Sequence, residues 1–242
     1  MKPAHVHLIS VVLAELQDLS PIAGRRRLRL LDIGCGYGGL MCDLQEVFSK
    51  IPGVELEVYG YEVFDHRAST PDYCEDVAER LSGRWPGGDW ADRVRVGEAC
   101  DPWPFESGFF NLAISNQVLE HVTDLEHLFR ETRRVVKPGG KAIHFYPSRS
   151  VLVEPHCGVP AAHWLCRGAA RRRWLRWLSA AGFGKFRSYR EERGCDLESY
   201  CREFSDYLNR YVFFRSNREV RRLGKAFSER CGFKYDGGLI RR

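Results

Sequence analysis

The stretch LLDIGCGYGGL, residues 30–40, constrains this chain more than any other feature. An apolar run ends at an aspartate, a glycine-rich loop follows, and a helical pattern begins directly after the loop. Glycine lets the backbone adopt left-handed conformations and approach a ligand without an intervening side chain. A buried strand, a glycine turn and a helix in this order are typical of an α/β domain that binds a small ligand at the turn.

The rest of the first 150 residues continues this alternation. The apolar runs that we expect to be strands lie at 27–33, 54–62, 92–99, 110–116 and 141–147. The helical patterns between and before them lie at 1–20, 38–50, 71–81 and 125–136. Strands that alternate with helices predict a mostly parallel sheet with helices on its faces. The fold class is therefore α/β, with a Rossmann-like core.

The alternation ends after Pro147. Residues 148–170 have no clean period, and helical patterns return over 171–183, 197–214 and 217–233. We therefore predict three parts: a ligand-binding core with an N-terminal helix at 1–147, an inserted and mainly helical cap at 148–215, and a C-terminal helix and strand at 216–242 that complete the core.

Composition excludes several other classes of protein. No run of 18 apolar residues is present, so a membrane-spanning helix is not expected. The first twenty residues contain charges and lack a small-residue cleavage pattern, which indicates an amphipathic helix and not a signal peptide. The nine cysteines contain no C-x-x-C pair, which argues against a disulfide framework and a structural zinc site. A cytoplasmic location is the simplest expectation.

Charge is divided unevenly along the chain. Residues 1–150 hold 17 Lys and Arg against 22 Asp and Glu, whereas residues 151–242 hold 20 against 10. This asymmetry indicates an anionic partner for the C-terminal third. A general preference for arginine, which supplies 30 of the 37 basic residues, would explain it equally well.

The glycine loop fits two kinds of cofactor. Gly34, Gly36 and Gly39 match the G-x-G-x-x-G fingerprint of dinucleotide-binding proteins. With Asp32 included, the same run matches the D-x-G-x-G-x-G loop that holds S-adenosylmethionine. A carboxylate at this point would repel a pyrophosphate but suits the ammonium group of a methionine moiety. Glu62, at the end of the second expected strand, can accept ribose hydroxyls in either case.

Downstream segments favour one of the two. With VGEA at 96–99, FNLAISNQVLEHV at 110–122 and VVKPGGKAIHFYP at 135–147, residues 28–148 resemble the class I S-adenosylmethionine-dependent methyltransferases that act on small molecules. The resemblance implies S-adenosylmethionine as cofactor, S-adenosylhomocysteine as product and a seven-stranded type of sheet. It places the loop residues around the methionine end, together with a residue after the fourth strand: Asp32, Gly34, Cys35, Gly36 and Asn116. It assigns the ribose to Glu62 and the adenine to Val63, Glu98 and the amide of Ala99.

Residues that could act on the methyl acceptor follow the fifth strand. Glu154, His156 and His163 lie within VEPHCGVPAAHW, residues 153–164. Ligands of open parallel sheets bind beyond the carboxyl ends of the strands. One histidine could serve as general base with Glu154 orienting it, or the segment could be a rigid loop whose histidines cap carbonyl groups. The spacing H-x6-H lacks the form of a metal motif, so we expect no metal.

The substrate stays open at this point. We expect a methyl transfer to a small molecule, more readily at oxygen than at nitrogen, with a sugar-containing or anionic natural product or surface-glycan precursor as acceptor. Residues 171–177 form a basic helix that could grip phosphate, rest on a membrane, or bury its tryptophans in a core. An RNA methyltransferase and a non-catalytic module that binds S-adenosylmethionine are the alternatives.

Overall fold

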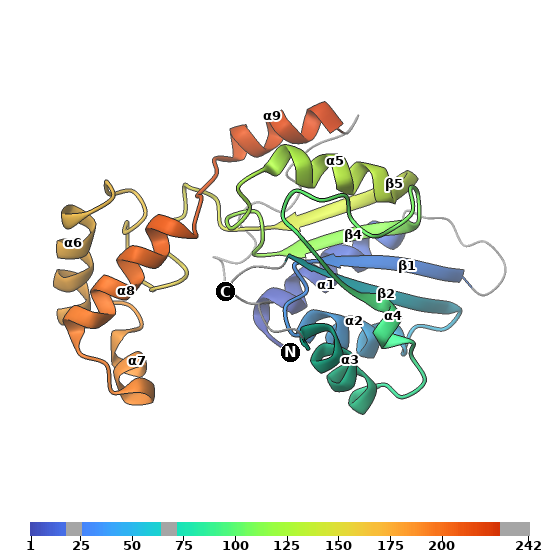
Figure 1. Cartoon of the computed structure of the whole chain (residues 1–242), viewed down its shortest axis with the longest axis horizontal. Helices are drawn as coiled ribbons and strands as arrows, with labels where there is room; N and C mark the ends of the chain where they lie inside the picture. Colours follow the sequence, from blue (N-terminus) through green and yellow to red (C-terminus); the bar gives the residue numbers. More distant parts are fainter. Residues whose placement is uncertain (18–25, 64–71, 228–242) are drawn as a thin grey trace. The chain divides into compact units, whose positions relative to one another are not determined.

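A parallel sheet forms the centre of the chain. The computed structural model describes residues 1–17, 26–63 and 72–227. Within these ranges the sheet has five parallel strands in the order β3-β2-β1-β4-β5 (Figure 1). The strands are β1 (Arg26–Ile33), β2 (Val54–Val63), β3 (Val94–Gly97), β4 (Phe110–Asn116) and β5 (Val136–Phe145). This arrangement confirms the predicted α/β class with a Rossmann-like parallel sheet.

The order of the strands defines where ligands can bind. β1 pairs with β2 on one side, Asp32 lying opposite Gly60, and with β4 on the other, Asp32 lying opposite Ile114. The chain therefore moves outward in one direction from β1 and returns to its other side with β4. Such a switch in strand order leaves a crevice at the carboxyl ends of the central strands.

The chain divides into two compact units. The sheet unit comprises Met1–Val118, Asp124–Phe145 and the described part of Leu223–Arg242, and the helical unit comprises Leu119–Thr123 and Tyr146–Arg222. The predicted boundaries at 148 and 215 stay a prediction.

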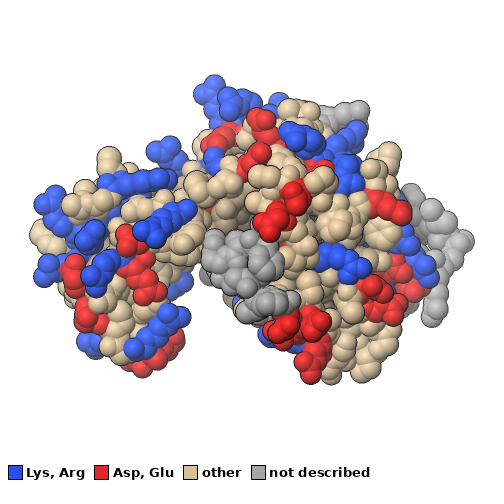
Figure 2. Space-filling view, in the orientation of Figure 1, with Lys and Arg blue, Asp and Glu red and all other residues tan. Residues whose placement is uncertain are grey.

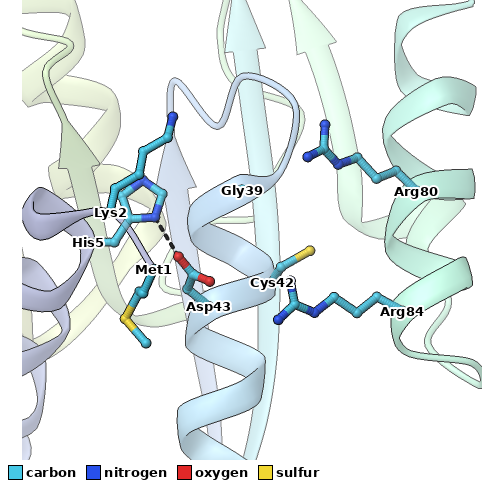
Figure 3. A pocket seen from close by; sticks show the side chains of 8 residues that line it. All are labelled: Met1, Lys2, His5, Gly39, Cys42, Asp43, Arg80 and Arg84. Atoms are coloured by element: carbon cyan, nitrogen blue, oxygen red, sulfur yellow. Dashed lines mark hydrogen bonds and ion pairs between the residues drawn. The ribbon is translucent and has the colours of Figure 1, made fainter.

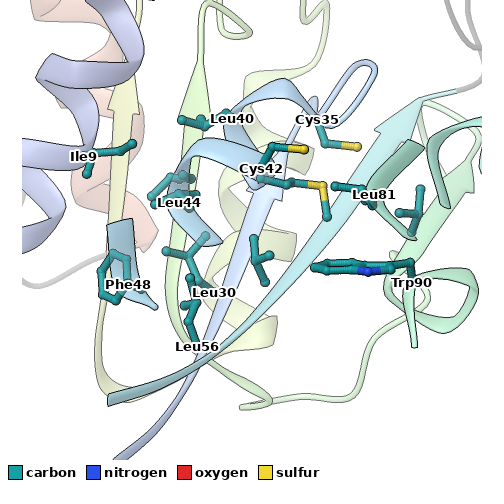
Figure 4. Close-up of a cluster of buried hydrophobic side chains, with 14 of the residues drawn as sticks. Ile9, Leu30, Cys35, Leu40, Cys42, Leu44, Phe48, Leu56, Leu81 and Trp90 are labelled. Atoms are coloured by element: carbon teal, nitrogen blue, oxygen red, sulfur yellow. The ribbon is translucent and has the colours of Figure 1, made fainter. Parts of the chain in front are cut away.

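Apolar side chains of three helices cover one face of the sheet. These helices are α1 (Pro3–Gln17), α2 (Gly39–Phe48) and α3 (Tyr73–Arg84). Figure 4 shows how Ile9, Leu44 and Leu81 meet side chains of β1 and β2 such as Leu30 and Leu56. Central strands of a parallel sheet are buried on both faces, and the neighbouring Leu30 and Leu31 of β1 are accordingly both fully buried.

The other face carries aromatic rings. Tyr59 and Tyr61 alternate along β2 with Val58 and Gly60, so they point away from the α2 side. Tyr61 packs on Trp103, with ring centroids 5.1 Å apart. α5 (Leu125–Val135) packs next to β5, and the short α4 (Trp90–Arg93) precedes β3.

The helical unit has a core of its own. It contains α6 (Ala169–Ala180), α7 (Phe186–Arg193) and α8 (Leu197–Arg210), and α9 (Asn217–Phe227) begins in it. Leu175 of α6 and Tyr200 of α8 are both fully buried there, together with Cys157 from the segment before α6. That segment lacks regular structure apart from a bridge between Val153 and Pro160.

Several details differ from the sequence predictions. β5 begins at Val136, because residues 137–140 bulge out between two stretches that both pair with β4. α7 was not predicted, and none of its residues is buried. The predicted final strand lies in 228–242, outside the described residues, so the sixth and seventh strands stay a prediction. Within the described ranges, each helix is too short or too polar to cross a bilayer.

Candidate functional site

The loop after β1 needs glycine at residue 34. Gly34 has φ 70°, and its N–H donates to the carbonyl of Tyr61 at 2.8 Å. A Cβ at this position would lie 2.4 Å from Cγ2 of Val118. The left-handed φ and the close approach both exclude a larger residue. The loop is thereby held against the end of β2.

Gly36 leaves open space at the tip of the loop. It has φ 51°, and a Cβ here would meet no atom within 4 Å. Its N–H donates to Oε2 of Glu62 at 2.8 Å, and the hydroxyl of Tyr73 donates to its carbonyl. The loop and Glu62, which the sequence places far apart, are therefore in direct contact at the carboxyl edge of the sheet.

Two buried oxygen atoms lie at the point where the strand order switches. Oδ2 of Asp32 at the end of β1 and Oδ1 of Asn116 at the end of β4 have no hydrogen-bond partner within the described ranges. Asp32 is 1% exposed. Burial, followed by the charge of Glu62, raises the pKa of Asp32 well above its ordinary value. Buried acceptors without donors are costly, and a cationic ligand with N–H groups would satisfy both.

The remaining predicted cofactor residues are placed differently from one another. The side chain of Cys35 is buried in the core, with Sγ 3.8 Å from the hydroxyl of Tyr73. Val63 ends β2, and its N–H donates to Oε1 of Glu62 at 3.1 Å. Glu98 and Ala99 directly follow β3 and are exposed. At Cys35 the backbone is therefore the part that can face a ligand, because the thiol points into the core.

The helical unit brings together two of the three predicted acceptor-side residues. Nδ1 of His156 lies 2.5 Å from Oε1 of Glu154, which is fully buried. Oε2 of Glu154 accepts the N–H of Cys157 at 2.7 Å. Burial alone would raise the pKa of Glu154, but these hydrogen bonds and the nearby imidazole hold it below its ordinary value. Glu154 therefore accepts a hydrogen from His156 and orients the ring.

His163 is held separately from this pair. Its Nε2 lies 3.1 Å from the carbonyl of Arg149, and its ring lies 4.4 Å from that of Phe214. Its Nδ1 has no hydrogen-bond partner in the described part of the chain, and burial lowers its pKa. This geometry resembles a packed histidine that stabilises the segment.

A second pair, Glu120 and His121, lies next to His156. The rings of His121 and His156 are 5.3 Å apart, and Glu120 precedes His121. Two hydrogen bonds hold this segment against the chain after α8. The carbonyl of Glu120 accepts from the N–H of Phe213 at 2.6 Å. The carbonyl of Tyr211 accepts from Nδ1 of His121 at 2.7 Å. The signal available in the sequence was the Glu-His dipeptide after the fourth strand.

Comparison with known protein families identifies the family to which this chain belongs. A profile described as "Methyltransferase domain" matches residues 5–206, which is most of the chain. The chain belongs to this methyltransferase family. Membership confirms the resemblance to class I S-adenosylmethionine-dependent methyltransferases that the sequence predicted, and with it S-adenosylmethionine as the cofactor.

Individual relatives of this methyltransferase domain differ in the atom that they methylate. A sterol 4-C-methyltransferase of Caenorhabditis elegans is 30% identical over 59% of this chain and 35% of its own length. A ubiquinone biosynthesis O-methyltransferase of Ralstonia nicotianae is 28% identical over 57% of this chain and 50% of its own. The chain therefore spans half or less of these two relatives. Among solved structures, the YcgJ protein of Bacillus subtilis has a TM-score of 0.48 at 18% identity, over 92% of this chain and 68% of its own.

The basic helix α6 of the methyltransferase does not bury its tryptophans as its core residues. Arg171, Leu175 and Ser179 are buried, whereas Trp177 is 78% exposed. The guanidinium of Arg171 donates to Oδ1 of Asn209 at 2.7 Å and to the carbonyl of Leu165 at 2.9 Å. The interpretation of Trp177 as a core residue is therefore wrong, and Arg171 is structural. Figure 2 shows other Lys and Arg side chains spread over the helical unit.

A hollow on the sheet unit lies apart from the predicted residues. It has a volume of about 390 Å³ and is lined from α1, α2 and α3 and by the residues before α1 (Figure 3). Nδ1 of His5 and Oδ2 of Asp43 meet there at 2.7 Å. Its lining contains none of the residues that the resemblance assigns to the cofactor.

Proposed function

We propose that this chain is an S-adenosylmethionine-dependent methyltransferase that acts on a hydroxyl group of a small molecule. The observation that carries the proposal is the pair of buried oxygen atoms on Asp32 and Asn116 beside the glycine loop. They offer acceptors for an ammonium group at the position where a parallel sheet binds ligands. The membership in the methyltransferase family supports the same assignment.

Each part of the edge has a role toward the bound cofactor, which supplies an electrophilic methyl group on a sulfonium. The oxygens of Asp32 and Asn116 accept from the methionine ammonium. Gly34 and Gly36 let the backbone come close, and Glu62, already positioned by the Gly36 amide, accepts the ribose hydroxyls. The backbone of Cys35 completes the loop. Val63 at the end of β2 contacts the adenine ring, together with Glu98 and Ala99, which follow β3.

The acceptor chemistry belongs to the helical unit. The acceptor oxygen forms a bond to the methyl carbon while the carbon–sulfur bond breaks and its electron pair stays on sulfur. A neutral alcohol is a weak nucleophile, so the acceptor must lose its proton, and a positioned imidazole promotes this loss. The fully buried Glu154 orients His156 for that role. His163 positions the segment by its contact with the Arg149 carbonyl.

An anionic or sugar-containing acceptor fits the charge of this region. Arg173 and Arg176 of α6 are exposed next to Trp177. Arginine side chains match the oxygens of phosphate groups, and an exposed tryptophan offers a face on which a ring can stack. Sugar nucleotides and phosphorylated glycans are therefore the first acceptors to test.

Calorimetric titration tests the cofactor half of the proposal. We expect S-adenosylhomocysteine to bind the purified chain, while NADH and NADPH do not. Asp32→Ala should weaken this binding about 100-fold or more, because the ammonium loses a buried, charge-assisted partner. Asp92→Ala is a matched control, since that carboxylate lies exposed on the same unit. Binding of a nicotinamide nucleotide instead would overturn the assignment.

A second experiment separates the cofactor residues from the acceptor residues. Transfer of a radiolabelled methyl group is measured over a panel of sugar nucleotides, phosphorylated glycans and phenols. His156→Ala and Glu154→Gln should bind S-adenosylhomocysteine as tightly as the parent chain but lower turnover about 10-fold to 100-fold. Loss of S-adenosylhomocysteine binding in both variants would contradict this division of roles.

A further inference from the structure

One glutamate and two histidines gather in the helical unit. Glu120, His121 and His156 each offer one ligand atom, and these three atoms lie within 4.8 Å of one another. Glu120 is 1% exposed, and both histidines are half-buried. Two imidazoles and one carboxylate form a donor set typical of zinc and other first-row divalent cations. Magnesium and calcium prefer oxygen ligands.

Hydrogen bonds define which nitrogen of each ring is available to a cation. Nδ1 of His121 lies 2.7 Å from the carbonyl of Tyr211, which can only accept, so this nitrogen carries the hydrogen. Nδ1 of His156 donates in the same way to the carboxylate of Glu154. A neutral imidazole with hydrogen on Nδ1 has its lone pair on Nε2. Both rings are therefore set in the tautomer that binds a metal through Nε2.

The supports behind the rings have the form found behind metal ligands. Histidine ligands commonly donate their second ring N–H to a carboxylate or a backbone carbonyl, which orients the ring and raises its basicity. His156 has the first kind of support and His121 the second. Glu154 is fully buried and also accepts the N–H of Cys157 at 2.7 Å, so its position is determined by the backbone.

The geometry of the cluster fits one divalent cation. Such an ion would be bound by the Nε2 lone pairs of both rings and by the carboxylate of Glu120 at the same time.

We propose that Glu120, His121 and His156 bind a divalent cation of the zinc type, with at least one coordination position left for water or an acceptor oxygen. A tetrahedral ion with bonds of about 2.1 Å needs ligand atoms about 3.4 Å apart, so the side chains move inward slightly when it binds. Sequence spacing did not reveal the site because its ligands come from residues 120–121 and from residue 156.

The cation also gives His156 a defined part in methyl transfer, an assignment that rests on the proposed function. A hydroxyl bound to a divalent cation loses its proton more easily than a free one. With the cation bound, Nε2 of His156 is a ligand and cannot also accept the proton. His156 then promotes the proton loss through the cation and not as the base, and the proton passes to solvent water. Ion binding itself does not depend on this role.

Cobalt titration tests the site directly. The purified full chain is stripped with a chelator and titrated with Co²⁺, with visible absorption and calorimetry as readouts. We expect one site whose spectrum shows d–d bands without a thiolate-to-cobalt band, which separates it from binding by the cysteines. Zn²⁺ should displace the cobalt. His121→Gln and His156→Gln should abolish the bands, and Glu154→Gln should weaken Co²⁺ binding about 10-fold to 100-fold by removing the support of His156.

Two controls keep this result interpretable. His127→Gln changes a histidine that belongs to the sheet unit and should leave the cobalt spectrum unchanged. Hydrogen exchange of α6 and α8, measured on every variant, reports whether the helical unit is folded. Cobalt bands that persist in both ligand variants, or that a thiolate band accompanies, would overturn the proposal. Failure to bind S-adenosylhomocysteine in the parent chain would overturn the proposed function and leave the cation site standing.

Discussion

The two candidate sites of this chain are built in different ways. The cofactor edge of the sheet unit consists of residues at the carboxyl ends of strands, such as Asp32, Glu62 and Asn116. The Glu120–His121–His156 cluster consists of side chains on irregular segments that hydrogen bonds hold in place. In the first case strand pairing brings the residues together, and in the second case individual contacts do so.

This difference determines how each site responds to substitution. A parallel sheet fixes the ends of all its strands at one edge, so a single side chain can change there without moving its neighbours. The irregular segments of the helical unit depend on a small core of their own around Leu175 and Tyr200. Loss of that core should therefore disturb the helical unit and leave the cofactor edge intact.

Leu175→Ala should give the largest effect and tests this independence. Leu175 is fully buried in the helical unit, and truncating a buried leucine typically costs about 3 kcal/mol. Hydrogen exchange measured by mass spectrometry should show faster exchange in α6 and α8, with β1 and β4 unchanged and S-adenosylhomocysteine still bound.

Trp177→Ala is the matched control for that variant. Trp177 lies on the same helix but is 78% exposed, so its truncation should change stability by less than about 0.5 kcal/mol. Equal loss of protection in α6 and in the sheet after Leu175→Ala would show that the two units unfold together.

Gly34→Ala should give a smaller effect, confined to the cofactor edge. The substitution places a Cβ at φ 70° and 2.4 Å from Cγ2 of Val118. The left-handed conformation alone costs about 1 kcal/mol, and displacement of Val118 adds to it. We expect a free energy of unfolding about 2 kcal/mol lower and weaker binding of S-adenosylhomocysteine by about 10-fold.

Gly87→Ala separates the two causes. Gly87 has φ 91°, but a Cβ there would meet no atom within 4 Å. This variant should therefore show the conformational cost without any loss of S-adenosylhomocysteine binding. If both glycine variants bind S-adenosylhomocysteine equally well, the close approach to Val118 has no part in positioning the loop.

The same difference explains what the sequence could predict. The strand expected at 27–33 is observed at Arg26–Ile33, because a buried parallel strand needs an apolar run and a glycine turn ends it. The residues at the carboxyl edge were assigned through the resemblance to methyltransferases, and the expected strand ends place them at one edge of the sheet. α7 was missed because only Phe186 and Tyr189 face the core and its other residues are polar, so its helical period is weak.

The side-chain contacts of the helical unit could not be predicted from the sequence, for a physical reason. The buried face of α6 contains Arg171 and not Trp177. Arg171 can be buried because its guanidinium donates to Oδ1 of Asn209 and to the carbonyl of Leu165. Periodicity cannot reveal such partners, since they come from another helix and from a loop. The contact of His156 with His121 arises in the same way, through the chain after α8 that holds the His121 segment.

A half-buried histidine on β5 of the sheet unit gives the last prediction and contrasts with the clustered histidines. Burial lowers the pKa of His144 to about 4, and its Nδ1 bonds to Oγ of Ser115 at 2.8 Å. The unfolded chain takes up this proton near pH 6.5, whereas the folded chain does not until about pH 4. The stability contributed by His144 is therefore complete above pH 6.5 and is lost as the pH falls toward 4, by up to about 1.4 kcal/mol per pH unit. Denaturant unfolding of the parent chain and His144→Gln from pH 7 to pH 4 should show this slope in the parent chain alone. His127→Gln, which changes a half-buried histidine of α5, should behave like the parent. Equal slopes in the parent chain and His144→Gln would mean that water reaches His144 in the folded protein, and the sheet unit would then lack the dry interior that distinguishes it from the cluster in the helical unit.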